Sequence, residues 1–142
     1  MIAVDTNLLV YAHRIDSPFH AAAEPVKRLA EGKAAWAIPW PCLHEFYNVV
    51  TNRRIHPVPT PIELAMTQIE EWLRSPTLHL LAETPAHWPQ LRELLAKGKV
   101  QGPMVHDARI AALCLAHGVR ELWSADRDFS RFPTLRVRNP LV

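Results

Sequence analysis

The sequence has few cysteines, few glycines and no long apolar run, and each shortage narrows what the protein can be. The two cysteines, Cys42 and Cys114, fall in apolar segments of helical periodicity. We therefore interpret them as small buried hydrophobic residues rather than a disulfide or a metal pair. No apolar stretch approaches the ~20 residues of a membrane span, and the first residues lack the basic and apolar regions of a signal peptide. We expect a cytoplasmic protein without a membrane segment.

Excess charge is also lacking, because 16 Lys and Arg residues face 14 Asp and Glu residues and the net charge is only +2. The overall balance therefore does not identify a partner. If five of the acids gather in one pocket, only nine are left to face the 16 basic residues over the rest of the surface. Such a bias favours polyanions such as nucleic acid.

Strand-like and helix-like segments alternate along the 142 residues, which is typical of βαβ crossovers. An apolar run over residues 1–4 predicts a buried strand, and Thr6 and Asn7 suit the cap of a helix that continues through Tyr11. The pattern predicts an α/β fold in one domain (residues 1–142), with three α/β/α layers and a four- to five-stranded, mostly parallel sheet. Further strands are expected at 34–38, 78–82, 121–125 and 135–138, and further helices at 19–31, 39–52, 62–74, 86–97 and 105–117.

Acidic residues occupy positions that share one edge of such a sheet. Asp5 and Asp126 follow strands, Asp107 lies in the first turn of a helix, and Glu45 lies in the first turns of the helix after the second strand. Ligands bind open α/β sheets at this edge, outside the carboxyl ends of the strands. Each acid also has a purely structural interpretation, since Asp5 can cap, Asp107 can favour the helix dipole, and Asp126 and Asp128 can be turn residues.

Taken together, the acids favour a cation site. Four or five carboxylates on one edge repel one another unless a multivalent cation or a raised pKa neutralises them. Oxygen ligands without a cysteine or histidine cage suit Mg²⁺, or alternatively Mn²⁺, which retain waters and hold substrate phosphates. The sequence therefore predicts such an ion at this edge.

Four segments of the chain together resemble the PIN domain, and in particular the VapC-type toxins of bacterial toxin–antitoxin pairs. They are Asp5-Thr6-Asn7, Glu45 with Asn48, residues 106–112 and residues 122–129. The resemblance covers essentially the whole length. It implies a PIN-like fold and a metal-dependent endoribonuclease whose acids are Asp5, Glu45, Asp107 and one or both of Asp126 and Asp128.

The residue types suggest a division of labour among these catalytic acids. One or two cations would lower the pKa of a water and stabilise charge on the phosphate. We assign Asp5 and Asp107 to direct metal ligation and Glu45 and Asp126 to the metal or its water, and we favour Asp126 over Asp128 as the fourth acid. The residues expected to orient them are Thr6, Asn7, Asn48 and Ser124.

Basic residues are candidates for gripping the RNA backbone, although an ordinary surface charge is the alternative at each position. They are Arg53, Arg54, Lys97, Lys99 and Arg127, together with Arg14 and Arg131. His44 and His106 each precede an acid, but neighbours on a helix point about 100° apart. We therefore interpret them as helix-end or packing residues rather than general acids or bases.

The resemblance also implies partners, namely an RNA substrate, a second copy in a homodimer and a cognate antitoxin. The C-terminal segment of such an antitoxin lies over the acidic site, often reaching it with an Arg or Lys. Two alternatives stay open: a PIN-like RNA-binding subunit without turnover, and a metal-dependent phosphatase, whose nucleophile pair Asp126-x-Asp128 resembles.

Overall fold

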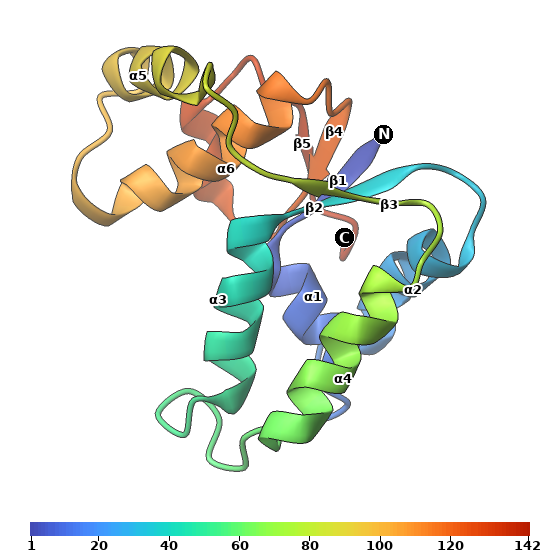
Figure 1. Cartoon of the computed structure of the whole chain (residues 1–142). Coiled ribbons are helices and arrows are strands. Elements are labelled where there is room, and N and C mark those ends of the chain that lie inside the picture. The colour runs from blue at the N-terminus through green and yellow to red at the C-terminus, as the bar shows by residue number, and fades with distance from the viewer.

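A parallel five-stranded sheet forms the centre of the molecule (Figure 1). The computed structural model describes residues 1–142, and the strand order is β3-β2-β1-β4-β5. The strands are β1 (Ile2–Val4), β2 (Trp36–Pro39), β3 (Leu78–Leu81), β4 (Glu121–Trp123) and β5 (Val137–Arg138). Every neighbouring pair is parallel, so the expected fold class is confirmed.

Six α-helices and three short 3₁₀ helices cover the sheet. The α-helices are α1 (Thr6–His13), α2 (Glu24–Glu31), α3 (Trp40–Thr51), α4 (Ile62–Leu73), α5 (His87–Lys97) and α6 (Val105–Ala116). The 3₁₀ helices are η1 (Ala21–Ala23), η2 (Gly102–Met104) and η3 (Arg127–Arg131). Helices α1 to α4 lie on one side of the sheet and α5 and α6 on the other (Figure 1). None of the helices is long and apolar enough to cross a membrane.

The strand order reverses between β1 and β4. The chain moves outward from β1 through β2 to β3 and then returns across the sheet to β4, so the two connections lie on opposite faces when the crossovers are right-handed. Val4 pairs with Trp123, and the amide of Asp5 donates to the carbonyl of Trp123 at 3.0 Å. This reversal point is where ligands bind in open α/β sheets, and Asp5 lies on it.

The core lies on both sides of the three middle strands. Trp36, Ile38 and Leu122 are fully buried, and α6 buries apolar residues on most sides because it packs in the centre of its layer. Helix α6 is terminated by Gly118 two residues after its end, where a φ of +67° is the left-handed conformation that glycine adopts most easily. Cys42 and Cys114 are free and buried, as predicted.

Two local predictions were wrong. The segment expected to be one helix over residues 19–31 is divided into η1 and α2. Helix α1 is capped by Asp5, whose side chain accepts from the amide of Thr6, rather than by Thr6 or Asn7. The apolar stripe of α4 is only partly covered, since Ala65 and Trp72 are its buried residues. Periodicity locates an apolar stripe but does not show how much of it a neighbour covers.

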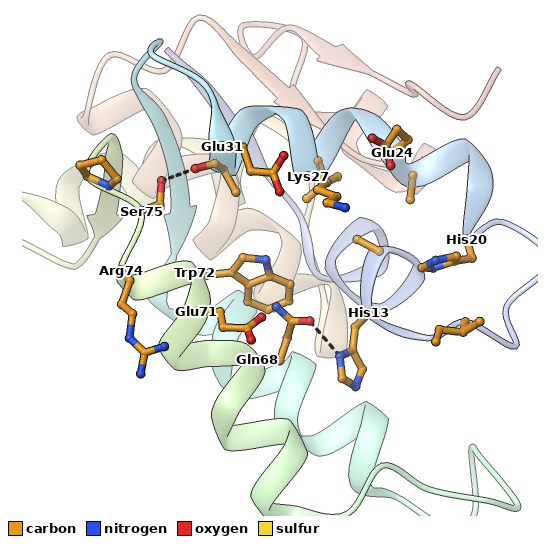
Figure 2. A pocket seen from close by; sticks show the side chains of 16 residues that line it. His13, His20, Glu24, Lys27, Glu31, Gln68, Glu71, Trp72, Arg74 and Ser75 are labelled. Carbon is orange, nitrogen blue, oxygen red and sulfur yellow. Dashed lines mark hydrogen bonds between the residues drawn. The ribbon is translucent and has the colours of Figure 1, made fainter.

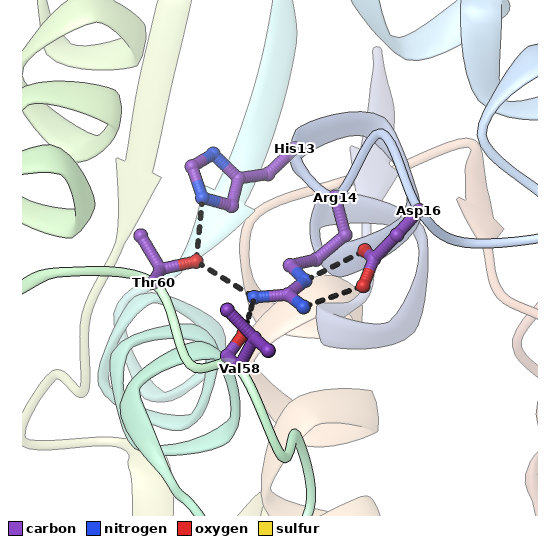
Figure 3. Close-up of polar contacts among 5 residues, drawn as sticks. All are labelled: His13, Arg14, Asp16, Val58 and Thr60. Carbon is purple, nitrogen blue, oxygen red and sulfur yellow. Dashed lines mark hydrogen bonds and ion pairs between the residues drawn. The ribbon is translucent and has the colours of Figure 1, made fainter.

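A polar cluster ties the end of α1 to the proline-rich segment 57–61 (Figure 3). Arg14 donates to the carbonyl of Val58 at 2.8 Å, to the hydroxyl of Thr60 at 3.3 Å, and to both carboxylate oxygens of Asp16. The His13 ring hydrogen-bonds with the Thr60 hydroxyl at 3.1 Å. The Arg14 side chain is only 10% exposed. Its donors are already engaged within the fold, which favours a structural role, and its contact with RNA stays a prediction.

Candidate active site

Asp5 is a buried carboxylate held by three donors. It lies between β1 and α1, and only 6% of it is exposed. The hydroxyl of Ser124 donates to Oδ2 at 2.7 Å, while the amide of Thr6 at 2.8 Å and the thiol of Cys42 at 3.6 Å donate to Oδ1. Burial raises the pKa of Asp5 despite these donors. The carboxylate is therefore fixed in orientation and unfavourable to ionise without a nearby cation.

Three further carboxylates converge beside the end of β4. Ligand oxygens of Asp107, Asp126 and Asp128 all lie within 4.8 Å of one another. Asp107 comes from the first turn of α6, whereas Asp126 and Asp128 belong to the turn that opens η3. The amide of Asp128 donates to Oδ1 of Asp126 at 2.8 Å, which shapes that turn and brings both side chains to Asp107.

All five predicted acids share one electrostatic environment. Burial, followed by the charges of Asp126, Asp5, Asp128 and Glu45, raises the pKa of Asp107 to about 6. Asp5 and Asp107 therefore lie on the same side of the molecule, as the sequence analysis required. The exposed Glu45 joins this group from the second turn of α3.

Neighbouring polar residues connect the acids to one another. The Thr6 hydroxyl donates to Oε2 of Glu45 at 3.2 Å. The Ser124 hydroxyl, besides donating to Asp5, accepts from the amide of Asp126 at 3.0 Å and from the side chain of Asn7 at 3.4 Å. Ser124 therefore links the acid after β1 to the acid after β4. Asn48 is exposed on α3 and lines a hollow beside Glu45.

That hollow has a volume of about 450 Å³ and lies between α3 and α6. Its lining includes His44, His106 and Arg109, none of which we singled out as functional residues. Both histidines are exposed, but His106 lies at the start of α6 and the His44 ring contacts the ring of Trp40, so the helix-end or packing interpretation still describes them. Their positions next to Glu45 and Asp107 were the available signal, but only the packing of α3 against α6 turns them to the same space.

A larger hollow of about 730 Å³ lies between α1, α2 and α4 (Figure 2). Lys27 of α2 and Glu71 of α4 line it, and the buried Trp72 contributes to its wall. In Figure 2 His13 hydrogen-bonds with Gln68 at this wall. None of the five clustered acids lines it, so this hollow is separate from the candidate site.

The basic candidates for RNA contact divide into two groups. Arg127 directly follows Asp126. Lys97 is the last residue of α5, and Lys99 lies in the turn after it, where Arg131 of η3 donates to the carbonyl of Gly98 at 3.2 Å. Lys97 also forms an exposed ion pair with α5 itself. Arg53 and Arg54 follow the far end of α3, about two helical turns beyond Glu45, and are exposed. All these contacts stay predictions.

Comparison with known proteins identifies the family. The PIN domain model matches residues 2–135. Ribonuclease VapC43 of Mycobacterium tuberculosis is 38% identical over 142 residues, covering 99% of this chain and 96% of that protein. Ribonuclease VapC48 of the same species is 34% identical over 137 residues, covering 96% and 94%. The chain belongs to the VapC-type PIN-domain ribonucleases.

Solved structures agree with this PIN fold. The VapC20 toxin of Mycobacterium tuberculosis, described as cleaving the sarcin–ricin loop, superposes with a TM-score of 0.68 at 18% identity, covering 92% of this chain and 93% of that one. The structure of VapBC2 from Rickettsia felis, bound to a promoter DNA fragment, superposes with a TM-score of 0.70 at 21% identity, and the match covers 98% of this chain and 98% of that one. At these identities the likeness supports the PIN fold alone.

Proposed function

We propose that this PIN domain is a metal-dependent endoribonuclease and the toxin of a type II toxin–antitoxin pair. The observation that carries the proposal is the convergence of Asp107, Asp126 and Asp128, whose oxygens lie within 4.8 Å of one another, beside Asp5 and Glu45. Relatives named ribonucleases at 34–38% identity support RNA as the substrate. RNA supplies the phosphodiester that such a cluster is suited to hydrolyse.

The acids fit a divalent cation. Every charged ligand group in the cluster is a carboxylate, and burial together with repulsion from the neighbouring acids raises the pKa of Asp107, both of which a cation would offset. Mg²⁺ is the ion we propose, with Mn²⁺ as an alternative, because both prefer oxygen ligands and hold phosphates. When bound, such an ion activates a water for attack on the phosphodiester and stabilises the charge that develops on the phosphate oxygens.

The protein side chains have separate tasks in this proposal. Asp107, Asp126 and Asp128 present the converging oxygens, and Asp5, held by Ser124, faces them from the end of β1. The Asp126 Oδ1 atom already accepts from the amide of Asp128, which leaves Oδ2 for a ligand. Glu45, positioned by the Thr6 hydroxyl, lies at the open side, where it can orient a water or the ion.

One assay separates ribonuclease activity from the two alternatives. The purified protein is incubated with Mg²⁺ or Mn²⁺, a labelled RNA and a phosphomonoester, with and without chelator. We expect metal-dependent cleavage of the RNA and no release from the monoester. RNA binding without cleavage would favour the non-catalytic subunit, and release from the monoester alone would favour a phosphatase.

Substitution of the acids tests the assignment of the site. Asp5→Asn and Asp107→Asn are each expected to lower the cleavage rate by at least ~10³-fold, because stabilisation of charge in an active site is worth several kcal/mol. Asp16→Asn, at an exposed aspartate outside the cluster, is the matched control and should retain wild-type activity. Wild-type activity in Asp5→Asn with unchanged circular dichroism would contradict the assignment.

We further propose that a cognate antitoxin inhibits the enzyme by laying a C-terminal Arg or Lys over the acids. Three solved structures with this fold are of VapBC proteins, from Rickettsia felis, Salmonella typhimurium and Haemophilus influenzae. A cationic side chain would offset the repulsion around Asp107 as a metal ion would. Titration with the protein encoded beside the toxin gene should abolish cleavage, and replacing its C-terminal basic residues with alanine should restore it.

A homodimer in the cytoplasm completes the proposal. Ile62, Met66 and Leu73 form an apolar stripe along α4 and are 58%, 39% and 41% exposed, so a second copy has an apolar surface to cover. Light scattering should give twice the chain mass of 16.2 kDa. Met66→Glu is expected to lower the measured mass toward that of the monomer. Glu63→Gln, at an exposed residue of the same helix, should leave the mass unchanged.

A further inference from the structure

The hollow between α3 and α6 adjoins the acid cluster through a shared residue. Glu45 belongs to the cluster and also lines the hollow, and His106 precedes Asp107 on α6. A group in the hollow would therefore lie beside a phosphodiester held at the acids. The volume of about 450 Å³ is in the range of small-molecule sites and accommodates one nucleotide.

The lining of the hollow is suited to a flat heterocycle. His44 and His106 line the hollow from different helices and are both exposed, and the ring of His44 also contacts the ring of Trp40. Unstacked RNA bases are recognised by stacking on aromatic side chains, including histidine, and on the plane of arginine, with hydrogen bonds to their edges. Pro41 and Ile110 add apolar surface, and Asn48 adds both a donor and an acceptor.

Arg109 is held in a defined orientation at this hollow. Its Nε atom donates to Oε1 of Glu83 at 2.6 Å, and its Nη2 atom contacts the same oxygen. Hydrogen bonds from its own backbone amide and from Arg109 hold the pKa of Glu83 below its usual value, so the ion pair persists at neutral pH. The pairing uses one edge of the guanidinium and leaves Nη1 to donate to a ligand.

We propose that this hollow binds the nucleobase adjacent to the scissile phosphodiester. One base stacks on His44 or His106, while Arg109 and Asn48 contact its edge. The inference rests on the proposed ribonuclease function and deepens it, because it assigns residues to substrate selection. These residues are separate from the acids, so their loss should affect binding of substrate more than the chemical step.

The test uses a single-stranded RNA oligonucleotide with a mapped cleavage site and matched versions that are abasic at one flanking position. The variants are the double substitution His44→Ala with His106→Ala, and the exposed His79→Ala on β3 as control. We expect the double variant to raise KM about tenfold, the scale of one lost base stack, with kcat within about twofold of wild type. His79→Ala should match the wild type.

The abasic position whose effect on KM is not additive with that of the double variant identifies the base that the hollow binds. One abasic position should raise KM for the wild type by at least the same factor and raise it by a smaller factor in the double variant, since the stacking contact is already lost there. His106→Phe in the His44→Ala background should restore KM if stacking is the contact, because phenylalanine keeps a flat ring without a titrating group. Mn²⁺ titration should show unchanged affinity in every variant. The subsite would be overturned if the KM increases from the abasic position and the double variant multiplied when combined, or if KM were unchanged in the double variant.

The design also separates this inference from the ribonuclease proposal. If the wild type cleaves RNA but the double variant and every abasic substrate behave as the wild type does, only the subsite is wrong. If the wild type cleaves no RNA, the ribonuclease proposal fails. In that case fluorescence anisotropy measures binding of the same oligonucleotides in chelator. If the hollow binds a base, an abasic position and the double variant each weaken binding by a similar factor, and the two together weaken it by less than the product of those factors. Unchanged affinity in the double variant and for every abasic oligonucleotide would reject the subsite.

Discussion

The acids of the site are placed where ionisation is unfavourable to the folded chain. Asp5 is buried beneath the hydroxyl of Ser124, and Asp107 is surrounded by four other carboxylates. Both have raised pKa values, so in the absence of a cation ionisation is less favourable in the folded state than in the unfolded chain. Ionisation of these two carboxylates therefore lowers the stability of the fold at neutral pH, and they are among the residues that we propose to perform the reaction.

This conflict predicts a pH-dependent effect of Asp107→Asn. The carboxyl pKa rises from 3.8 to about 6 on folding, so its contribution to stability is complete below pH 3.8 and is lost as pH rises through 6. Asparagine does not titrate. In chelator, the variant should gain stability over the wild type between pH 4 and 7, measured by urea unfolding. Saturating Mn²⁺ at pH 7 should remove that gain, and a pH-independent difference would contradict the assigned pKa.

Ser124 offers a second prediction, because its hydroxyl connects Asp5 with Asp126. Ser124→Ala removes the donor to Asp5, and loss of a residue that orients a metal ligand typically costs about 10–100-fold in metal affinity or activity. We expect a loss of that size in cleavage, with the fold retained. The exposed Ser130→Ala is the control and should be neutral. Equal activities of the two variants would show that Asp5 needs no such support.

Among the elements, the connection between α1 and segment 57–61 depends on side chains rather than on regular hydrogen bonding. Arg14 supplies donors to the carbonyl of Val58 and the hydroxyl of Thr60, and its side chain is nearly buried (Figure 3). Segment 57–61 leads from α3 to α4, so the cluster determines where α4 begins. The contact belongs to the fold and lies apart from the five acids.

Arg14→Ala should therefore destabilise the protein without affecting catalysis. Loss of its hydrogen bonds to the Val58 carbonyl and the Thr60 hydroxyl costs about 0.5–1.5 kcal/mol of unfolding free energy for each bond. Asp16→Ala should cost less, because Asp16 is 64% exposed and its ion pair is weakened by solvent. Urea unfolding measures both effects, and kcat of the folded fraction should stay at the wild-type value. A larger loss in Asp16→Ala than in Arg14→Ala would contradict this account.

At the scale of the whole molecule, positive charge is distributed unevenly around the acids. Arg127 and Lys99 are near the turn that carries Asp126 and Asp128, whereas Arg53 and Arg54 follow the opposite end of α3. We therefore expect RNA bound at the acids to contact Arg127 and Lys99 more readily than Arg53 and Arg54. The net charge of +2 conceals this arrangement, because it averages over the whole surface.

The two pairs of basic residues should differ in their effect on RNA affinity. Lys99→Ala with Arg127→Ala is expected to raise KM and to reduce the slope of log affinity against log salt by about 0.7 for each lost phosphate contact. Arg53→Ala with Arg54→Ala removes the same charge and should change both quantities less. Cleavage assays from 50 to 300 mM salt give the comparison. Equal slopes for the two double variants would show that the RNA path extends along α3.

Much of the fold was predictable because local periodicity reflects burial. The apolar run before Asp5 and the continuous apolar surface of α6 identified the central strand and the central helix within one or two residues. The exposed apolar residues of α4 and the break before α2 were not predictable, since each depends on which neighbours pack there. Within the candidate site, the acids were found from their positions after strands and in first helical turns.

From the order of amino acids alone came the alternation of strands and helices, and with it the edge at which Asp5, Glu45, Asp107 and Asp126 had to lie, because parallel crossovers bring carboxyl ends together. The tertiary structure decided the rest. Whether Asp128 joins Asp126, what holds Asp5, and which side chains surround Glu45 depend on how η3, β4, α3 and α6 pack, and packing is a property of distant residues in contact rather than of local sequence.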